Sequence, residues 1–173
     1  MRVLRHFSNI PADLKGCTVV IGNFDGVHRG HQTVIGRAAE IACKSDTPLI
    51  AMTFEPHPRH YFKPDTLPFR LTPFRAKVTQ IDALGVDAML VVAFNRLFSQ
   101  ITADEFVDDV LVAGLGAKNV VVGYDFTFGR DRGGDTEFLA AKAPAKNFEF
   151  TTVQPVATAD AVIYSSTVIR NYL

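Results

Sequence analysis

Two histidines placed three residues apart, His28 and His31, have the spacing that most directly suggests chemistry. They lie in a stretch that also holds Gly22, Gly26 and Gly30, and glycines allow a sharp turn and a close approach of a ligand to the main chain. A helix is expected to begin at residue 30, so both rings can lie on one side of its N-terminus, where free amides and the helix dipole favour an anion. Two imidazoles beside a phosphate can donate hydrogen bonds to its oxygens and spread the charge that develops as a bond to phosphorus changes partner. The pattern therefore predicts electrostatic catalysis at a phosphate, with no covalent intermediate.

Other interpretations of this stretch differ in what they require. The chain lacks GxxxxGK[ST], which excludes a P-loop NTPase, and it lacks GxGxxG after the first apolar strand, so the dinucleotide-binding fingerprint is absent. A glycine-rich turn with two solvated histidines is the simplest alternative, and the position of the loop directly after a strand disfavours it. A zinc site is another alternative, because His57 and His60 repeat the spacing. Four histidines without a carboxylate or thiolate would, however, be an unusual zinc set.

A second candidate loop combines prolines with aromatic side chains. Residues 53–59 have the sequence TFEPHPR, and Tyr61 and Phe62 follow closely. The two prolines restrict the shape of the loop before any ligand arrives, and the aromatic rings offer flat apolar surface suited to a planar ring system. A surface loop whose aromatic rings anchor in the core explains the pattern equally well when this loop is considered alone.

Two further stretches join cationic side chains to aromatic or hydroxyl groups. Residues 123–135 have the sequence GYDFTFGRDRGGD, which suits a loop that contacts both a ring and a phosphate or ribose. Core packing is the alternative for Phe126 and Phe128, and one of the two is expected in the core. Residues 164–170 have the sequence YSSTVIR. Their hydroxyls can cap a helix or bond phosphate oxygens, and Arg170, one turn further on, suits a pyrophosphate leaving group. Taken alone, this stretch is also an ordinary helix N-cap.

The elements that position these loops alternate between short apolar runs and segments of helical period. This order is typical of βαβ units and predicts an α/β fold, a Rossmann-like open and mainly parallel five-stranded sheet with helices on both faces. The predicted strands are residues 18–21, 48–54, 88–93, 119–123 and 148–153, and the predicted helices are residues 30–43, 72–84, 102–115, 136–142 and a final one within 165–173. Thr102 and Glu105 form a capping box at the third helix. In such a sheet ligands bind at the carboxyl ends of the strands, where all the candidate loops fall.

Composition narrows the class of protein further. A chain of 173 residues is the size of one domain. It has 18 basic and 18 acidic residues and a pI near 7.0, so no overall field favours nucleic acid or an anionic membrane. The two cysteines, Cys17 and Cys43, form no metal-binding or disulfide motif. No signal segment or membrane span is evident, which predicts a soluble, cytoplasmic protein with neither nucleic-acid nor membrane partners.

The four stretches together resemble one protein family. The first stretch, GNFDGVHRGH, is similar to the signature GxFDGVHxGH, and the second, TFEPHPR, is similar to a flavin-side loop. Residues 123–135 are similar to the pattern GxDFxFGxxRxGD. The last stretch, YSSTVIR, is similar to ISSTxIR, with Tyr164 replacing an aliphatic residue. These signatures belong to prokaryotic FAD synthetases, the FMN adenylyltransferase half of the bifunctional riboflavin kinase/FAD synthetase family, within the HxGH nucleotidyltransferase superfamily. The resemblance covers essentially all 173 residues.

The resemblance implies roles for individual residues. The implied catalytic residues are His28, His31 and Arg170. The implied ATP-binding residues are Gly22, Asn23, Phe24, Asp25, Gly26, His28, Gly30, His31, Gly123, Asp125, Arg130, Ser165, Ser166, Thr167 and Arg170. The implied flavin-binding residues are Phe54, Pro56, His57, Pro58, Phe62 and Phe128. Some relatives have asparagine at the position of Asp125, and a carboxylate only accepts hydrogen bonds where an amide can also donate.

The reaction that the resemblance implies converts FMN and ATP to FAD and pyrophosphate. Mg²⁺ is expected through the substrate phosphates, with Asp25 nearby but no certain protein ligand. Residues 1–173 are expected to form the adenylyltransferase domain alone, and without a riboflavin kinase module the chain is not expected to make FMN. Two alternatives stay open: another HxGH nucleotidyltransferase, acting on a phosphopantetheine or an alcohol phosphate, and a catalytically silent flavin or ATP sensor.

Overall fold

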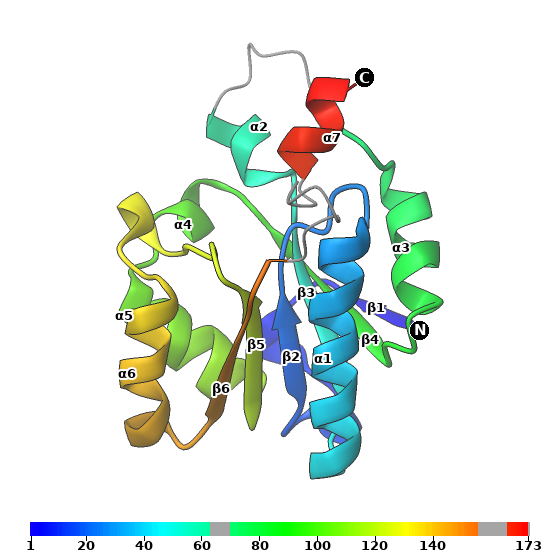
Figure 1. The fold of residues 1–173 in the computed structure, drawn as a ribbon. Coiled ribbons are helices and arrows are strands. Elements are labelled where there is room, and N and C mark those ends of the chain that lie inside the picture. Colours follow the sequence, from blue (N-terminus) through cyan, green and yellow to red (C-terminus); the bar gives the residue numbers. More distant parts are fainter. Residues whose placement is uncertain (63–69, 156–165, 173) are drawn as a thin grey trace.

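A single parallel sheet forms the centre of the computed structural model, which describes residues 1–62, 70–155 and 166–172. The strand order is β1-β4-β3-β2-β5-β6, and every pair of neighbours is parallel. The strands are β1 (Arg2–Leu4), β2 (Thr18–Ile21), β3 (Leu49–Glu55), β4 (Ala88–Ala93), β5 (Asn119–Gly123) and β6 (Glu149–Val153). Figure 1 shows the sheet lying between helices. The α/β class, the open parallel sheet and the helices on both faces are therefore confirmed.

Residues that alternate along each strand enter two separate apolar layers. Val19 and Ile21 pack with one cluster and Val20 with the other, and all three are buried. A strand that is covered on both faces needs apolar residues at every position. This explains why the strands appear in the sequence as continuous apolar runs rather than as alternating ones.

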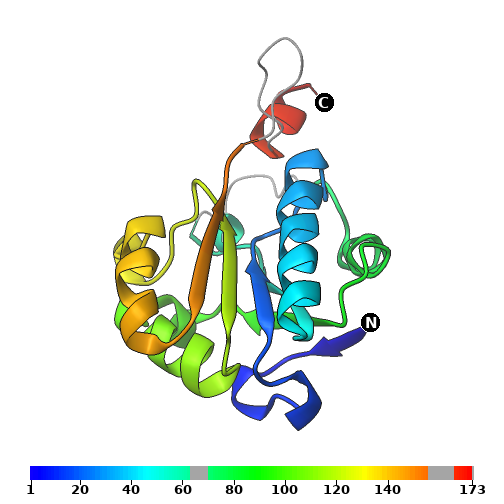
Figure 2. The same cartoon turned by 60° about the horizontal axis from the view of Figure 1, so that its bottom comes forward.

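Helices cover both faces of this sheet. Side chains of α1 and α3 pack in the cluster that contains Val20, whereas those of η3 and α6 pack in the cluster that contains Val19. Figure 2 shows the two helical layers from a second direction. The helices are η1 (Phe7–Asn9), η2 (Ala12–Leu14), α1 (Arg29–Ser45), α2 (Pro58–Phe62), α3 (Phe74–Asp82), α4 (Arg96–Ser99), α5 (Ala103–Glu105), the π-helical η3 (Phe106–Gly114), η4 (Arg130–Arg132), α6 (Thr136–Lys146) and α7 (Ser166–Tyr172).

Local sequence signals explain where several helices begin and end. The predicted capping box is present, since the Glu105 amide donates to Thr102 Oγ1 at 3.1 Å and the Thr102 amide donates to Glu105 Oε2 at 2.7 Å. The side chain of Asp135 caps α6 in the same way, accepting from the Phe138 amide at 2.8 Å. The helix α1 is followed by the C-cap residue Asp46, which has a left-handed conformation with φ of 49°. These caps satisfy backbone groups that a helix end leaves without an intrahelical partner.

The sheet differs from the prediction by one strand. The five predicted strands are present with ends that agree within one residue, but β1 adds a sixth at the edge beside β4. Its three residues are exposed or half-buried, because an edge strand of this length has one neighbour and little cover. Arg2–Leu4 therefore lacks the apolar run that identifies the inner strands. The short helices α2 and α4 were also missing from the prediction, since four or five residues are too few to show a helical period.

Candidate active site

The first loop is shaped by the packing of Phe24. Its ring is 1% exposed, and a Cβ atom placed on Gly22 would lie 2.9 Å from it. Phe24 has φ of 49°, a conformation that non-glycine residues seldom adopt. Its ring meets that of His31 edge-on, with centroids 5.4 Å apart. Gly22 is thus required to make room for Phe24, and Phe24 supports the histidine with its side chain, while a contact of Phe24 with ATP stays a prediction.

The two histidines lie against each other at the start of α1. The rings of His28 and His31 are stacked, with centroids 3.7 Å apart and planes inclined by 24°. Both residues are half-buried, and the Nδ1 atoms of both are buried without a hydrogen-bond partner in the part of the chain that the structure describes. The predicted convergence of the two rings on one side of the helix N-terminus is therefore present.

Burial makes both imidazoles poor bases. Desolvation, followed by the neighbouring His28, lowers the pKa of His31 to about 3, and desolvation lowers the pKa of His28 as well. Asp25 opposes both shifts, while Arg170 adds to the lowering of the His28 pKa. Both rings are consequently neutral near pH 7. An anion bound beside them would favour their protonated forms and raise both pKa values.

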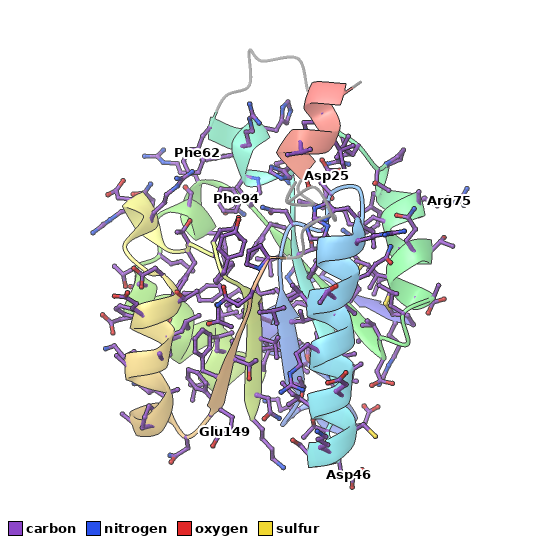
Figure 3. The ribbon with its side chains drawn as sticks, in the orientation of Figure 1. Asp25, Asp46, Phe62, Arg75, Phe94 and Glu149 are labelled. Atoms are coloured by element: carbon purple, nitrogen blue, oxygen red, sulfur yellow. The ribbon has the colours of Figure 1, made fainter. Side chains whose placement is uncertain are left out.

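Asp25 joins the first loop to the C-terminal helix. Its buried carboxylate accepts hydrogen bonds from the amides of Leu71 and Thr72 at 3.2 and 3.1 Å and forms an ion pair with Arg170, 145 positions further along the chain. The hydroxyl of Ser166 donates to the Asp25 carbonyl at 2.8 Å. Figure 3 shows Asp25 directly beneath α7. The structure thus brings the first and last signatures together.

The contacts of Asp25 also concern the expected Mg²⁺ ion, because they determine whether its carboxylate can bind a metal. Because the carboxylate oxygens of Asp25 already accept from two amides and a guanidinium, this side chain is engaged by the protein rather than presented to an ion. Among residues 1–62, 70–155 and 166–172 no three His, Cys, Asp or Glu side chains form a group that could hold a metal. Of the remaining predicted residues at the C-terminal end, Ser165 and the side chain of Thr167 lie outside the described part of the chain.

The second and fourth loops also approach the histidines. The charges that influence the pKa of His57, after the dominant effect of its burial, belong to Asp25, Arg170, Lys77 and Glu55. His57 Nδ1 accepts a hydrogen bond from the Arg59 amide at 3.1 Å, which holds the orientation of the ring. Asp125 is exposed, and its charge is close enough to His28 to oppose slightly the lowering of the His28 pKa by burial. Side chains from five separate segments therefore share one electrostatic environment.

Aromatic rings extend from the core to the surface beside α2. Phe54, which is 7% exposed, packs against Phe94 and Phe98 at centroid distances of 6.2 and 5.8 Å. Phe62 is 64% exposed and meets Phe94 edge-on at 5.7 Å. Figure 3 shows Phe62 above Phe94. Phe54 is thus mainly a core residue, while Phe62 offers a free ring face. Phe94 was not predicted as a site residue, although its position directly after a strand end was a signal that could have identified it.

The fourth loop places one of its aromatic rings, that of Phe128, in the core. Phe128 is buried, with the rings of Phe106 and Phe126 at 4.9 and 5.4 Å, and a Cβ atom on Gly134 would lie only 2.5 Å from its ring. Phe128 is therefore the ring of this loop that packs in the core, the alternative that the sequence analysis allowed for one of the pair. Phe126 is only partly buried. A contact of Phe128 with flavin stays a prediction.

Arg130 lies apart from the other predicted cations. Its amide donates to the Ile101 carbonyl at 2.7 Å, and its half-exposed side chain lies 3.8 Å from the carboxylate of Asp131. These contacts anchor it beside the start of α5, which belongs to the layer on the opposite side of the sheet from α1. Among the described contacts none links Arg130 to the two histidines, and its role in ATP binding stays a prediction.

A buried lysine beneath the first loop was missed by the sequence analysis. Lys77 is 2% exposed, and its ammonium donates to the Asn23 carbonyl and to Glu55 Oε1, both at 3.0 Å. Arg70 contacts the other oxygen of Glu55 at 2.5 Å. Glu55 ends β3 inside a stretch singled out from the sequence, but nothing in the helical pattern of residues 72–84 indicates that Lys77 points inward. The side-chain oxygen of Asn23 is buried and has no partner among the described residues.

Comparison with known proteins identifies the family. The model of the family described as FAD synthetase matches residues 10–167. The chain belongs to the FAD synthetase family. It is 42% identical over 173 residues to the bifunctional riboflavin kinase/FMN adenylyltransferase of Pseudomonas fluorescens and 39% identical over 174 residues to that of Escherichia coli K12. In both cases 100% of this chain and 55% of the relative are covered, so the chain spans about half the length of the curated relatives it matches.

Solved structures extend the comparison of folds for this chain. A macrolide-efflux protein from Streptococcus pneumoniae matches with a TM-score of 0.79 and 27% identity over 99% of this chain and 55% of that one. The pantoate-beta-alanine ligase of Francisella tularensis, solved with beta-gamma ATP and beta-alanine, matches with a TM-score of 0.61 and 14% identity over 98% of this chain and 73% of that one. The similarity to the ligase, at 14% identity, shows a shared fold only. No helix in the described part of the chain is long and apolar enough to span a membrane.

Proposed function

We propose that this chain transfers the adenylyl group of ATP to FMN, producing FAD and pyrophosphate. Membership of the FAD synthetase family supports the reaction. The observation that carries it is the meeting of stacked His28 and His31 with Arg170, which is tied to Asp25 of the same loop. Neutral imidazoles and a guanidinium around one helix N-terminus form a set of donors suited to a polyphosphate.

In the proposed reaction a phosphate oxygen of FMN attacks the α-phosphorus of ATP in line. A new oxygen–phosphorus bond forms as the bond from the α-phosphorus to the bridging oxygen breaks, and pyrophosphate departs with that bond's electron pair. No general base is required, because the FMN phosphate is already an anion at neutral pH. His28 and His31 donate hydrogen bonds to the oxygens that gain charge, and Arg170 with Ser166 and Thr167 receives the pyrophosphate.

Magnesium enters this proposal as part of the nucleotide substrate. Mg²⁺ commonly binds phosphate oxygens with only one or two carboxylates, and Asp25 is already held by protein donors. The ion would neutralise phosphate charge while bound to ATP. We place no protein ligand on it.

For the flavin, the exposed ring of Phe62 and the rigid segment that holds Pro56, His57 and Pro58 support a planar ligand. Phe54 and Phe128 lie mainly in the core, and the contact of each with the flavin stays part of the proposal. The cytoplasmic location and the assignment of residues 1–173 to one adenylyltransferase unit belong to the same proposal. The proposal does not include the riboflavin kinase activity that the relatives' names also state.

The test is the formation of FAD from FMN, ATP and Mg²⁺, followed by chromatography, with CTP and GTP as control nucleotides. His28→Ala and His31→Ala should each lower kcat strongly, by about 100-fold or more, while quenching of FMN fluorescence on binding changes little. Equal losses of FMN affinity and turnover in His28→Ala would contradict the catalytic role.

Two results would replace the proposal with one of the alternatives. Binding of FMN and ATP without any product would indicate a catalytically silent sensor. Transfer of a nucleotide to a phosphopantetheine or an alcohol phosphate, with no quenching of FMN fluorescence, would indicate another nucleotidyltransferase of the same fold.

A further inference from the structure

The buried ammonium of Lys77 lies beneath the loop that contains both histidines. It is 2% exposed and makes two polar contacts at 3.0 Å, one with Glu55 and one with the Asn23 carbonyl. Burying a lysine is costly unless it is paired and hydrogen-bonded, and apolar residues of similar volume often stabilise a fold as well as a buried ion pair does. Stability alone is therefore a weak reason for a lysine here.

The Asn23 carbonyl is held from two directions. The hydroxyl of Thr53 on β3 donates to it at 3.1 Å, and Lys77 on α3 donates to it at 3.0 Å. A carbonyl oxygen has two lone pairs, so these two donors complete its capacity. They orient the peptide unit that joins Asn23 to Phe24.

That peptide unit determines how Phe24 enters the loop. Its rotation changes φ of Phe24, which is 49° and sparsely populated for a residue with a side chain. A strained angle persists only where its surroundings hold it in place. The Phe24 ring in turn packs edge-on against His31 at 5.4 Å, and His31 stacks on His28. A continuous series of contacts thus links the ammonium to the two imidazoles.

From these contacts we infer that Lys77 is a positioning residue for the proposed adenylyl transfer: by holding the Asn23 carbonyl together with Thr53, it keeps Phe24, His31 and His28 in the arrangement that meets the phosphate. The inference rests on the proposed function. Lys77 does not itself touch the reacting atoms. Its charge also helps to keep the pKa of His31 low, after the effects of burial and of His28.

Three variants separate this role from that of the ion pair. Lys77→Met removes both contacts of the ammonium, Glu55→Gln removes the charge of its partner but keeps an oxygen for Lys77, and Thr53→Val removes only the second donor to Asn23. Thr53→Val is close in shape, and it leaves the carbonyl bonded to Lys77, so this variant is expected to fold. Lys146→Met, which breaks the surface ion pair with Asp108, is the control.

Lys77→Met is expected to lower kcat by about 10- to 100-fold, because small misplacements of catalytic groups have effects of this size. Thr53→Val should lower kcat by about 3- to 10-fold in the same way. The KM for FMN should stay within about twofold of the parent value in both, and Glu55→Gln and the control should keep kcat within about threefold. Unchanged kcat in folded Lys77→Met would overturn the inference, as would equal losses of kcat in Lys77→Met and Glu55→Gln. If Lys77→Met does not fold, an unchanged kcat in Thr53→Val overturns it instead.

Amide hydrogen exchange separates failure of this inference from failure of the proposed function. A parent protein that makes no FAD would refute the function. The amides of residues 24–28 should exchange faster in Thr53→Val than in the parent, and at the parent rate in Lys146→Met. That result would still support the positioning of the loop by these donors. Equal exchange in all three proteins would overturn it whatever the activity.

Discussion

Replacing Asp25 with asparagine removes the charge that ties the first loop to the C-terminal helix. In the parent chain three donors converge on this carboxylate, the amides of Leu71 and Thr72 at 3.2 and 3.1 Å and the guanidinium of Arg170. Asparagine has the same shape but only one acceptor oxygen, and its NH₂ group must face one of those donors. At least one donor therefore loses its partner, and the ion pair is lost.

The size of the effect follows from these contacts. A hydrogen bond to a charged group contributes about 1.5–3 kcal/mol, and the two amide contacts are longer than the usual 2.9 Å or so, which favours the lower end. Arg170 is 17% exposed, so water can compensate part of its loss. The loss of one amide contact and of the ion pair together is expected to lower the free energy of unfolding by about 3 kcal/mol. For a chain of this size that corresponds to a decrease in Tm of about 6–12 °C.

The assay is thermal unfolding followed by circular dichroism, combined with the FAD-forming reaction. Glu40→Gln is the matched control, because Glu40 pairs with Arg37 at 2.7 Å on the exposed surface of α1, where the expected loss is below about 0.5 kcal/mol. Asp25→Asn should also lower kcat, since Arg170 loses its anchor beside the histidines. A Tm for Asp25→Asn equal to that of Glu40→Gln would refute the view that Asp25 holds α7 in place.

Three further predictions concern the histidines, the core and the flavin surface. The pKa of His31 is about 3 in the folded chain and 6.5 when unperturbed, so between these pH values the unfolded state binds more protons than the folded state. The free energy of unfolding should therefore fall as the pH is lowered from 6.5 towards 3. His31→Asn should show a shallower fall of Tm over that window, measured in buffers of equal ionic strength. Gly134→Ala would place a Cβ atom 2.5 Å from the Phe128 ring, and urea unfolding should show a loss of about 1–3 kcal/mol; an unchanged midpoint would contradict the close packing. Phe62→Ala removes a ring that is 64% exposed, so the KM for FMN should rise about 3- to 10-fold with Tm unchanged, whereas a lower Tm with unchanged KM would place this ring in the fold rather than the site.

The parts of the site that the sequence predicted are those that depend on neighbours along the chain. The run Thr18–Ile21 identifies a buried strand, and the glycines and histidines that follow lie where strand-to-helix loops must meet in a parallel sheet. The spacing of Thr102 and Glu105 likewise specified a cap that the structure contains. His28 and His31 lie on one side of α1 because three residues are close to one helical turn.

Local sequence could not indicate which of several similar side chains would turn inward. Phe54 and Phe62 are both aromatic residues of the second loop, yet one is 7% and the other 64% exposed, because β3 is covered by elements far away in the sequence. The inward position of Lys77 depends on Glu55 and Asn23, and the ion pair of Asp25 depends on a residue 145 positions away. Residue types and spacing along the chain thus determined five of the six strands, the cap at Thr102 and the identity of the candidate loops. Burial and long-range pairing, which arise only when distant segments pack, decided which side chains line the site and which hold it in shape.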